Sequence, residues 1–375
     1  MNQAVVHTKR GFVLVWVLFF AGCISQPDEH LHTENQVLNG LLQQGTITTI
    51  HLDSMPVDTV LARVGNIMGK ERAASLTAPG VLDHAVDLAK IGDSLYVADS
   101  GQQCIWVMDN RGKWVRRIGR AGRGPGEFGI LTGIDGNSKH IFTFDHSNVR
   151  VQVYDHQFNL KTSFDHAATI SGREIVVNDN AIFILEDYTE QNNLIGMFRA
   201  SPPFDYTGSF WSPIVPYGKQ PLTYNKYVIT ANDANRVALA FMGLPYVFIL
   251  DSNQEVDRIL YLNSSLWKEI KQENPSVRPV IQGSIQNIRV AAYILHLHLA
   301  NDGDLYLRTR DAFYILNADD GTYRLKKAIR FLTTEKIVPN SSGPMRVPSE
   351  AMDIQDDTVY FASGFTEYIY RFPLN

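Results

Sequence analysis

A glycine-rich stretch, GRAGRGPGEFG at residues 119–129, is the first segment whose composition suggests chemistry. Phosphate-binding loops use glycines to bring backbone N–H groups close to an anion, and they lead directly into a helix. The P-loop form also ends in Lys followed by Ser or Thr, and here neither that pair nor a helix-forming pattern follows. Glycine equally permits positive φ, and Pro125 fixes one backbone dihedral. The stretch is therefore predicted to be a sharp corner between two strands rather than a phosphate site.

Four arginines lie in or just before this stretch, although the chain as a whole carries a formal net charge of −5. Arg116 and Arg117 are predicted to lie on an outermost strand, where charged side chains discourage pairing with other sheets. Arg120 and Arg123 fall in the predicted corner together with Glu127. A guanidinium presents a planar fork that suits the carboxylate, sulfate or phosphate group of a ligand. Arg120, Arg123 and Glu127 therefore either hold the loop in place or contact a ligand.

A second set of polar side chains lies in or beside short turns that follow aromatic-rich strands in successive parts of the chain. Its members are Asp99, Asp145, His146, Glu186, Asp187, Arg308, Arg310 and Asp311. If these parts are the blades of one ring, the turns converge on one rim around a central channel, where carboxylates and a histidine suit Ca²⁺. Asp also favours turns, because its side chain accepts hydrogen bonds from nearby backbone N–H groups. Two corresponding turns, FMG and ASG, carry no metal ligand, so turn formation is the preferred interpretation and a Ca²⁺ site stays open.

Other signs of catalysis or metal binding are weak in this sequence. LHLHL puts His296 and His298 on one face of a strand, but no third metal ligand lies nearby, so polar contacts between blades are preferred. No GxSxG or HExxH motif occurs. The sequence therefore favours a binding protein over an enzyme. The alternative is a metal-dependent hydrolase or lyase with its site in the central channel.

The order of short strands and turns repeats six times along the chain. Runs of β-branched and aromatic residues alternate with clusters of Gly, Asn and Asp, and helical periodicity is almost absent. The last copy stops after three strands, so residues 45–54 or residues 58–65 are predicted to supply its fourth strand. The pattern predicts an all-β fold, a six-bladed β-propeller of four-stranded antiparallel blades whose ring is closed by an N-terminal strand. The six copies begin near Val86, Thr132, Arg173, Tyr227, Leu295 and Ala351.

One part of the repeat resembles a known family. IGRAGRGPGEF, followed by an Asp-containing turn and VRVQVYD, resembles the NHL-repeat propellers, and especially the six-bladed propeller lipoproteins of bacterial envelopes. The specific motif is confined to about residues 85–155, and the strand rhythm extends the resemblance over about residues 45–375. The resemblance implies the fold and a location in the envelope, and it implies no reaction.

The first residues have the composition of an export signal. Lys9 and Arg10 precede the apolar run GFVLVWVLFFAG, which is too short to span a bilayer comfortably. The run ends at Cys23, and FAGC resembles a bacterial lipobox with Phe20 in place of the usual Leu. The protein is therefore expected to be exported and anchored to a bacterial membrane by a lipid on Cys23. Whether it faces the periplasm or the cell surface stays open.

These patterns predict that the chain divides into three parts. Residues 1–22 are predicted to be a lipoprotein signal peptide, residues 23–44 a polar tether and residues 45–375 the propeller. An insertion at residues 263–289 interrupts the repeat and is predicted to be partly helical, because it begins with helix-capping serines. Trp267 in this insertion either packs the helix onto the propeller or contacts a ligand or partner.

Composition narrows the class of partner. With a pI near 6.1, the chain has no overall electrostatic attraction to nucleic acid. The predicted partners are a membrane, through the lipid anchor, and an envelope protein, a peptide or a glycan bound at the rim. Cys104, the second of only two cysteines, lies in a strand-like run and is predicted to be a small buried hydrophobe.

Overall fold

The computed structural model describes most of the chain from Gln36 to the C-terminus. The predicted signal peptide and Cys23 lie outside the described residues, as do Glu186 and Asp187. No helix within the described part of the chain has the length and apolar character needed to cross a membrane. The described residues are 36–63, 67–69, 82–166, 175–185, 193–214, 226–273, 292–334, 345–347, 351–364 and 367–375.

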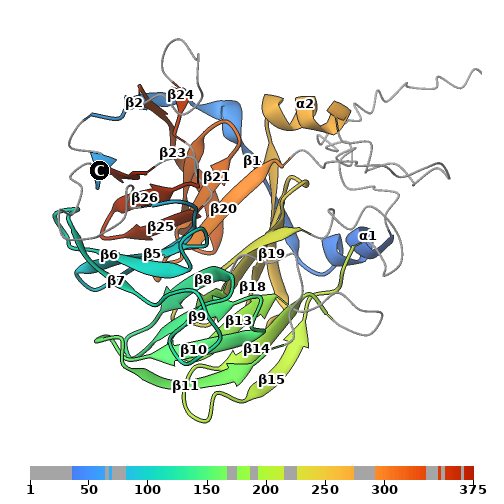
Figure 1. Ribbon diagram of the computed structural model, residues 1–375. Helices are drawn as coiled ribbons and strands as arrows, with labels where there is room; N and C mark the ends of the chain where they lie inside the picture. The colour runs from blue at the N-terminus through green and yellow to red at the C-terminus, as the bar shows by residue number, and fades with distance from the viewer. Residues whose placement is uncertain are drawn as a thin grey trace, which may run out of the picture.

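The fold is an all-β, six-bladed propeller, which confirms the prediction from the repeat (Figure 1). Each blade contains a four-stranded antiparallel unit whose successive strands are neighbours in the sheet. From the innermost strand outward, the first blade is β4 (Ala85–Ile91), β5 (Ser94–Asp99), β6 (Cys104–Met108) and β7 (Trp114–Ile118), and the second is β8 (Leu131–Gly136), β9 (Ile141–Asp145), β10 (Arg150–Tyr154) and β11 (Leu160–Asp165). The third blade is β12 (Ile175–Val177), β13 (Ala181–Leu185), β14 (Ile195–Arg199) and β15 (Tyr206–Phe210), and the fourth is β16 (Tyr227–Ala231), β17 (Val237–Phe241), β18 (Tyr246–Leu250) and β19 (Val256–Asn263). The fifth blade is β20 (Ile294–Leu299), β21 (Leu305–Thr309), β22 (Phe313–Asp319) and β23 (Thr322–Thr333), and the sixth is β25 (Ala351–Gln355), β26 (Thr358–Ala362), β27 (Ile369–Pro373) and β3 (Ile67–Met68). The innermost strands contact one another in the ring order β4, β8, β12, β16, β20, β25 and back to β4.

The middle strands of a blade are buried on both faces, because neighbouring blades cover them. In the first blade, every residue of β6 is buried, whereas the outermost strand β7 is exposed from Val115 to Arg117. Apolar clusters span neighbouring blades, and one of them joins Ala238 of β17 to Leu305 of β21. Cys104 is fully buried, and burial raises the pKa of its thiol to about 12, so the residue is the small buried hydrophobe that its strand-like context predicts.

Side-chain amides also join the blades, at the turns between first and second strands. The amide of Asn137 donates a hydrogen bond of 3.2 Å to the carbonyl oxygen of Asn178 in the third blade. Asn178 in turn donates to the carbonyl of Asn232 in the fourth blade (2.9 Å), and Asn232 donates to the carbonyl of Ala300 in the fifth (3.1 Å). These contacts set the position of each turn against the next from the second blade to the fifth.

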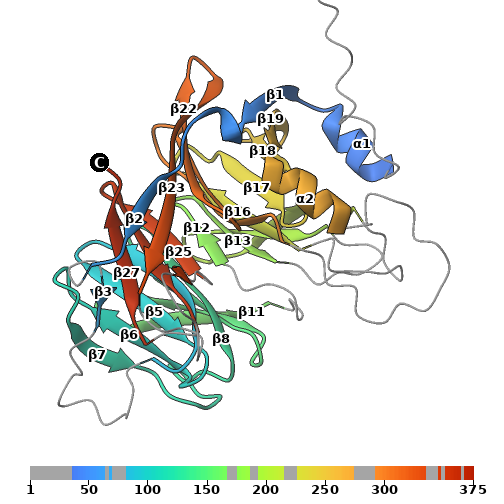
Figure 2. The ribbon, with the colours of Figure 1, turned by 90° about the horizontal axis from the view of Figure 1, so that it is seen from above.

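An N-terminal strap, which we define as residues 46–63 and 67–69, runs over the outer edges of three blades and closes the ring (Figure 2). Its first strand, β1 (Thr46–His51), pairs in parallel with β19 of the fourth blade. Its second, β2 (Asp58–Leu61), pairs in parallel with β23 of the fifth blade, which also carries the short strand β24 (Met345–Arg346). Its third, β3, pairs antiparallel with β27 and is the fourth strand of the sixth blade. The prediction of closure by an N-terminal strand is confirmed.

Both predicted closing segments were wrong, because neither is the fourth strand of the sixth blade. Residues 45–54 contain β1 and residues 58–65 contain β2, and each adds to the edge of a blade that already has four strands. The sequences of these two segments resemble those of fourth strands because all strands at the outer edge of a blade share a half-exposed composition. The strand that does close the ring has only two residues and carries no pattern of its own.

The closing strand is held to the first blade as well as to the sixth. The Gly69 N–H donates to the Gly112 carbonyl (3.1 Å), and the Trp114 indole N–H donates to the Gly69 carbonyl (3.3 Å). Gly69 has a φ of +81°, and a Cβ there would lie 2.9 Å from Met108 Cε, so the turn requires glycine. Met68 is buried in the cluster between the sixth and first blades.

Two α-helices of the described residues pack on the propeller. Helix α1 (Gln36–Leu42) lies within the predicted tether, and its buried leucines share an apolar cluster with the third and fourth blades, so the folded body begins before residue 45. Helix α2 (Ser265–Glu273) begins the insertion, as predicted. The hydroxyl of Ser264 caps it by accepting the Trp267 N–H at 3.0 Å. The insertion beyond Glu273 lies outside the described residues.

Candidate functional site

Two kinds of connection meet at one end of the propeller, which we call the crossing-loop face. They are the links from the outermost strand of one blade to the innermost strand of the next, and the turns between second and third strands. Because the four strands of a blade alternate in direction, both kinds lie at the same end. The parts of this face used below are residues 82–84, 100–103, 119–130, 146–149, 310–312 and 345–347.

The glycine stretch at residues 119–129 is a closed corner on this face, as predicted. Its backbone folds on itself, since the Phe128 N–H donates to the Arg120 carbonyl (2.8 Å) and the Gly122 N–H donates to the Phe128 carbonyl (2.9 Å). Phe128 is fully buried below the loop. Gly119 has a φ of +78°, and a Cβ there would overlap the Phe128 ring. Strands precede and follow the loop, and no helix begins within described residues 119–136.

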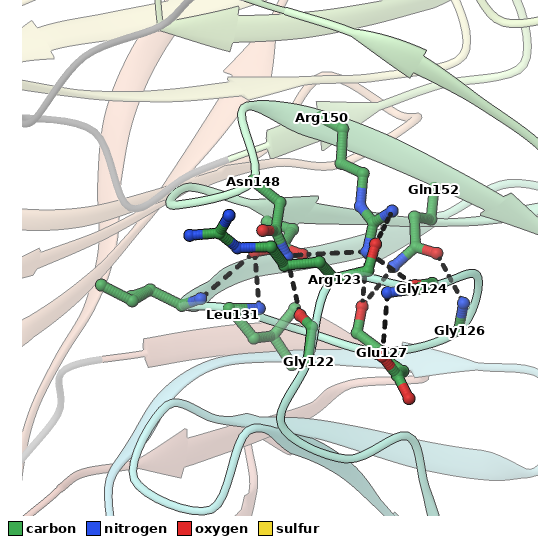
Figure 3. A network of polar contacts seen from close by, with 12 residues as sticks. Gly122, Arg123, Gly124, Gly126, Glu127, Leu131, Asn148, Arg150 and Gln152 are labelled. Atoms are coloured by element: carbon green, nitrogen blue, oxygen red, sulfur yellow. Dashed lines mark hydrogen bonds and ion pairs between the residues drawn. The ribbon is translucent and has the colours of Figure 1, made fainter.

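Side chains of the second blade fill the inside of this corner (Figure 3). The Arg150 guanidinium donates to the carbonyls of Arg123 (3.0 Å), Gly124 (2.9 Å) and Glu127 (2.8 Å). The Gln152 amide accepts the Gly126 N–H at 2.8 Å and donates to the Glu127 carbonyl at 3.0 Å. The N–H groups of Gly122, Gly124 and Gly126, which a phosphate cradle would offer to its ligand, therefore already donate to acceptors of the protein itself.

The charged side chains of the corner divide into two groups. Glu127 accepts the Gly124 N–H (2.8 Å) and pairs with Arg120 (2.8 Å). These contacts, the backbone hydrogen bond first, hold the pKa of Glu127 below its usual range. Arg120 and Glu127 therefore hold the loop in place. The Arg123 side chain is exposed and has no polar partner within the described residues, so it is free to contact a ligand.

Asp99 is fully buried at the end of β5 and accepts hydrogen bonds from the fold around it. Its carboxylate accepts the N–H groups of the incoming link at Asp83 (2.9 Å) and His84 (3.1 Å). It also accepts the N–H groups of Gly101 and Gln102 in its own turn, both at 3.0 Å, and the Trp106 indole N–H at 3.2 Å. The carboxylate thus ties the incoming link to the turn between β5 and β6.

Asp145 occupies the same position in the second blade. It accepts the N–H groups of Gly129 (3.0 Å) and Ile130 (3.1 Å), the Asn148 amide (2.7 Å) and, more weakly, Arg150 (3.4 Å). Both carboxylates therefore form turns, as the preferred interpretation predicts. His146 lies next to Asp145, half-buried, with its ring against Phe144. Within the described part of the chain, no three acidic, histidine or cysteine side chains are grouped so that they could hold a metal ion.

Arg308, which the sequence predicts to be a ligand-binding residue, is buried in the structure. It lies in β21, 3% exposed, with its guanidinium 5.6 Å from the centre of the Phe361 ring in the sixth blade. Its Nη2 group donates a long hydrogen bond to the Val347 carbonyl at 3.3 Å. Its Nε and Nη1 groups are buried and have no hydrogen-bond partner among the residues that the structure describes.

Asp311 forms ion pairs with two arginines of the fifth blade. It pairs with Arg330 at 2.8 Å and with Arg346, whose other Nη group donates to the Arg310 carbonyl at 2.6 Å. The structure thus brings Arg308, Arg310 and Asp311 together, and adds Arg330 and Arg346, which sequence reasoning missed. Their signal was weak because Arg330 is on an outermost strand and Arg346 is on a link outside the repeat.

Trp267 is buried rather than presented on the surface. It is 5% exposed, and its ring lies 5.6 Å from the ring of Tyr293, centre to centre. Of its two predicted roles, the structure supports packing α2 onto the propeller. The prediction that Trp267 contacts a ligand finds no support in this position.

The innermost strands carry a set of polar residues that sequence reasoning missed, apart from the blade-to-blade contact expected of His298. Each side chain accepts a backbone N–H of the next blade around the ring. The contacts are Asp87 to Ile134 (2.9 Å), Asp135 to Val177 (2.7 Å), Thr230 to Leu299 (3.2 Å) and Asp353 to Lys90 (2.6 Å). His298 lies 3.8 Å from Asp353 through Nδ1. An alignment of the copies by their first strands would have placed Asp135, Thr230, His298 and Asp353 at one position.

Asp135 is an acid of this set whose pKa is strongly raised. Desolvation first, and the nearby charge of Asp353 second, raise its pKa to about 8, while the backbone N–H groups of Val177 and Gly136 oppose the rise. Desolvation also raises the pKa of Asp353 and lowers that of His298, the neighbour that faces it. The carboxyl group of Asp135 is therefore largely protonated in the folded protein at neutral pH.

A pH dependence of stability follows from Asp135. Because its folded pKa exceeds the ordinary value near 3.8, its contribution is complete below about pH 4 and is lost as the pH rises through about 8. The free energy of unfolding should fall by about 1 kcal/mol per pH unit between pH 6 and 8. Asp135→Asn, which keeps an acceptor for Val177, should flatten this slope in urea titrations, and Asp93→Asn, at an exposed turn position, should not. An unchanged slope in Asp135→Asn would contradict the assignment.

Comparison with known proteins supports the fold and goes no further. Residues 84–201 match the model of a family described as a 6-bladed beta-propeller. No curated protein matches the sequence. By fold and site, the chain is a six-bladed propeller with arginines and turn-forming carboxylates on its crossing-loop face.

Solved structures with a similar chain trace are distant in sequence. A protein of Bacteroides fragilis described as exported is 14% identical, with a TM-score of 0.46 over 75% of this chain and 80% of that one. A Bacteroides vulgatus protein is 12% identical, with a TM-score of 0.46 over 77% and 92% of the two chains. A catalytically inactive variant of the virginiamycin B lyase of Staphylococcus aureus, with quinupristin, is 14% identical, with a TM-score of 0.44 over 78% and 82%.

Proposed function

We propose that this protein is an exported lipoprotein of the bacterial envelope whose propeller binds a ligand or a partner protein through the crossing-loop face. A propeller presents one broad face of loops on a rigid ring, and this supports a role in binding or as a scaffold. The resemblance of the glycine corner to NHL-repeat propeller lipoproteins supports the envelope location.

One observation carries the binding role. The carboxylates of the crossing-loop face that could have held a metal, Asp99 and Asp145, accept hydrogen bonds from the fold around them. The arginines of the same face are less fully used, because within the described residues Arg123 is exposed without a polar partner and two nitrogen atoms of Arg308 have no acceptor. In the part of this face that the structure describes, cationic donors are therefore available for recognition.

Lipid anchoring rests on the export signal and Cys23. Helix α1 begins at Gln36 and packs on the propeller, so a short segment of about a dozen residues would join the lipid to the folded body. Such a segment would keep the propeller close to the bilayer. A single acyl chain binds membranes only marginally, and the two or three chains of a bacterial lipoprotein hold stably.

Cys23→Ala tests this anchor. We expect the variant to incorporate no radiolabelled palmitate, whereas the wild-type chain is labelled and remains with the membrane fraction after a carbonate wash. Cys104→Ala removes the buried thiol and should leave labelling and membrane association unchanged. Equal palmitate labelling of Cys23→Ala and wild type would refute the lipoprotein assignment.

A further inference from the structure

The buried guanidinium of Arg308 lacks the partners that a buried charge requires. Folded proteins almost always pair a fully buried arginine with a carboxylate or satisfy its donors with hydrogen bonds. The guanidinium of Arg308 makes a long hydrogen bond to the Val347 carbonyl and lies near the Phe361 ring. Its Nε and Nη1 donors meet no acceptor in the described part of the chain. A fold built only for stability would not retain this arrangement, because an apolar side chain of similar volume would be more stable there.

The nearest carboxylate does not neutralise Arg308. Asp311 already pairs with Arg330 and Arg346. Desolvation and the charge of Arg346 lower the pKa of Arg308 to about 10, and this still leaves the guanidinium protonated at neutral pH. Among the described residues, Arg308, Arg330 and Arg346 thus share one carboxylate, so two positive charges of this group are uncompensated.

We propose that Arg308 and Arg346 form a binding site for the doubly charged oxyanion group of a ligand, such as a phosphate monoester or a sulfate. This inference names the chemistry recognised at the crossing-loop face, so it rests on the proposed binding function for its choice of face but not on the lipid anchor. Arg308 supplies the donors on the closed side of the site. Arg346, with 47% of its side chain exposed, supplies them on the open side.

The preference for a dianion follows from charge and geometry together. Two uncompensated guanidinium charges are balanced by one sulfate or one fully ionised phosphate, and a single carboxylate would leave one charge unpaired. Nε and Nη1 of Arg308 lie on different edges of the guanidinium, so one anion meets one of these two donors, and the further oxygens of a tetrahedral group are left to accept from Arg346. Arg330 Nε, also buried and without a partner in the described residues, is a further donor beside Asp311.

Thermal unfolding of the propeller in sodium sulfate, phosphate, acetate and chloride at equal ionic strength tests the site. Sulfate should raise the midpoint of the wild-type protein more than chloride or acetate does, since binding to the native state stabilises it. The extra shift in phosphate should grow between about pH 6 and pH 8, as the dianion replaces the monoanion, while that in sulfate should change little. Sulfate also stabilises proteins nonspecifically, so each shift is compared between variants.

Arg308→Met and Arg346→Gln are the informative variants, and Arg199→Gln is the matched control. Arg199 is an exposed arginine paired with Asp205 on the third blade. We expect at least tenfold weaker sulfate binding in Arg308→Met and Arg346→Gln, and wild-type binding in Arg199→Gln. Without added anion, Arg308→Met should unfold at a higher temperature than wild type, because it removes a buried unpaired charge.

Two results would overturn the proposal. One is an equal extra shift by sulfate in wild type, Arg346→Gln and Arg199→Gln. The other is a fall in the anion-free midpoint of Arg308→Met with an unchanged response to sulfate, which would make Arg308 a structural residue. Neither result bears on the palmitate labelling of Cys23, so failure of the anion site and failure of the lipid anchor are distinguishable.

Discussion

Deletion of residues 1–69 is expected to leave a chain that does not form a cooperatively folded ring. The deletion removes the fourth strand of the sixth blade and exposes the edge of β27, and it strips the added strands from the fourth and fifth blades. It also removes seven buried apolar side chains, each except the alanine worth about 1.5–3 kcal/mol, a sum on the order of 10 kcal/mol. The stability of a domain is of similar size, about 5–15 kcal/mol. The side chains are Leu38, Leu41, Leu42, Ile50, Leu52, Ala62 and Met68.

A shorter deletion provides the control for this result. Removal of residues 1–35 takes away the predicted signal peptide and part of the tether but keeps α1 and the whole strap. This protein should show one sharp unfolding transition by circular dichroism, and the protein lacking residues 1–69 should show none or should aggregate. Equal transitions in the two proteins would mean that the strap does not close the ring.

Asp145→Ala is expected to destabilise the propeller by about 3 kcal/mol, the largest loss we predict for a single substitution. The carboxylate is fully buried and accepts from Gly129, Ile130 and Asn148. Removal leaves these donors, and part of the Arg150 guanidinium, buried without an acceptor. The glycine corner and the turn between β9 and β10 would lose their shared attachment.

Urea unfolding compares the free energy lost in Asp145→Ala with that lost in two other variants. Asp145→Asn keeps one acceptor oxygen and should cost less than Asp145→Ala. Asp165→Ala changes an exposed carboxylate in the same blade and should stay within about 0.5 kcal/mol of wild type. A cost of Asp145→Ala no larger than that of Asp165→Ala would show that the carboxylate does not organise the crossing.

The sequence predicts the blades well because their signals are local. Alternation of short apolar strands with Asp, Asn and Gly turns marks each of the six copies, and the absence of a helix-forming pattern after residue 129 is enough to identify the glycine corner. The turn role of Asp99 and Asp145 follows from residue type and place in the repeat. These features depend on contacts within one blade or between consecutive blades.

The strap and the inner-strand contacts escape prediction for a different reason. The pairing of β1 with β19 joins Thr46 to Arg258, and no local pattern specifies which free edge a strand will choose. The burial of Arg308 depends on Phe361 of the next blade and on Val347 of a link outside the repeat. The raised pKa of Asp135 depends first on burial and then on the charge of Asp353, which is far away along the chain. Partners so distant in sequence become visible only when the ring is assembled.

Anomalous diffraction from crystals of the propeller soaked in selenate, a heavier analogue of sulfate, is the most direct test of recognition at the crossing-loop face. We predict a selenium peak within hydrogen-bonding distance of Arg308 Nε or Nη1 and of the Arg346 guanidinium in wild-type crystals. The same peak should be absent from Arg346→Gln crystals grown in the same form. A wild-type map with no selenium at Arg308 and Arg346 would contradict an oxyanion-binding role for this face.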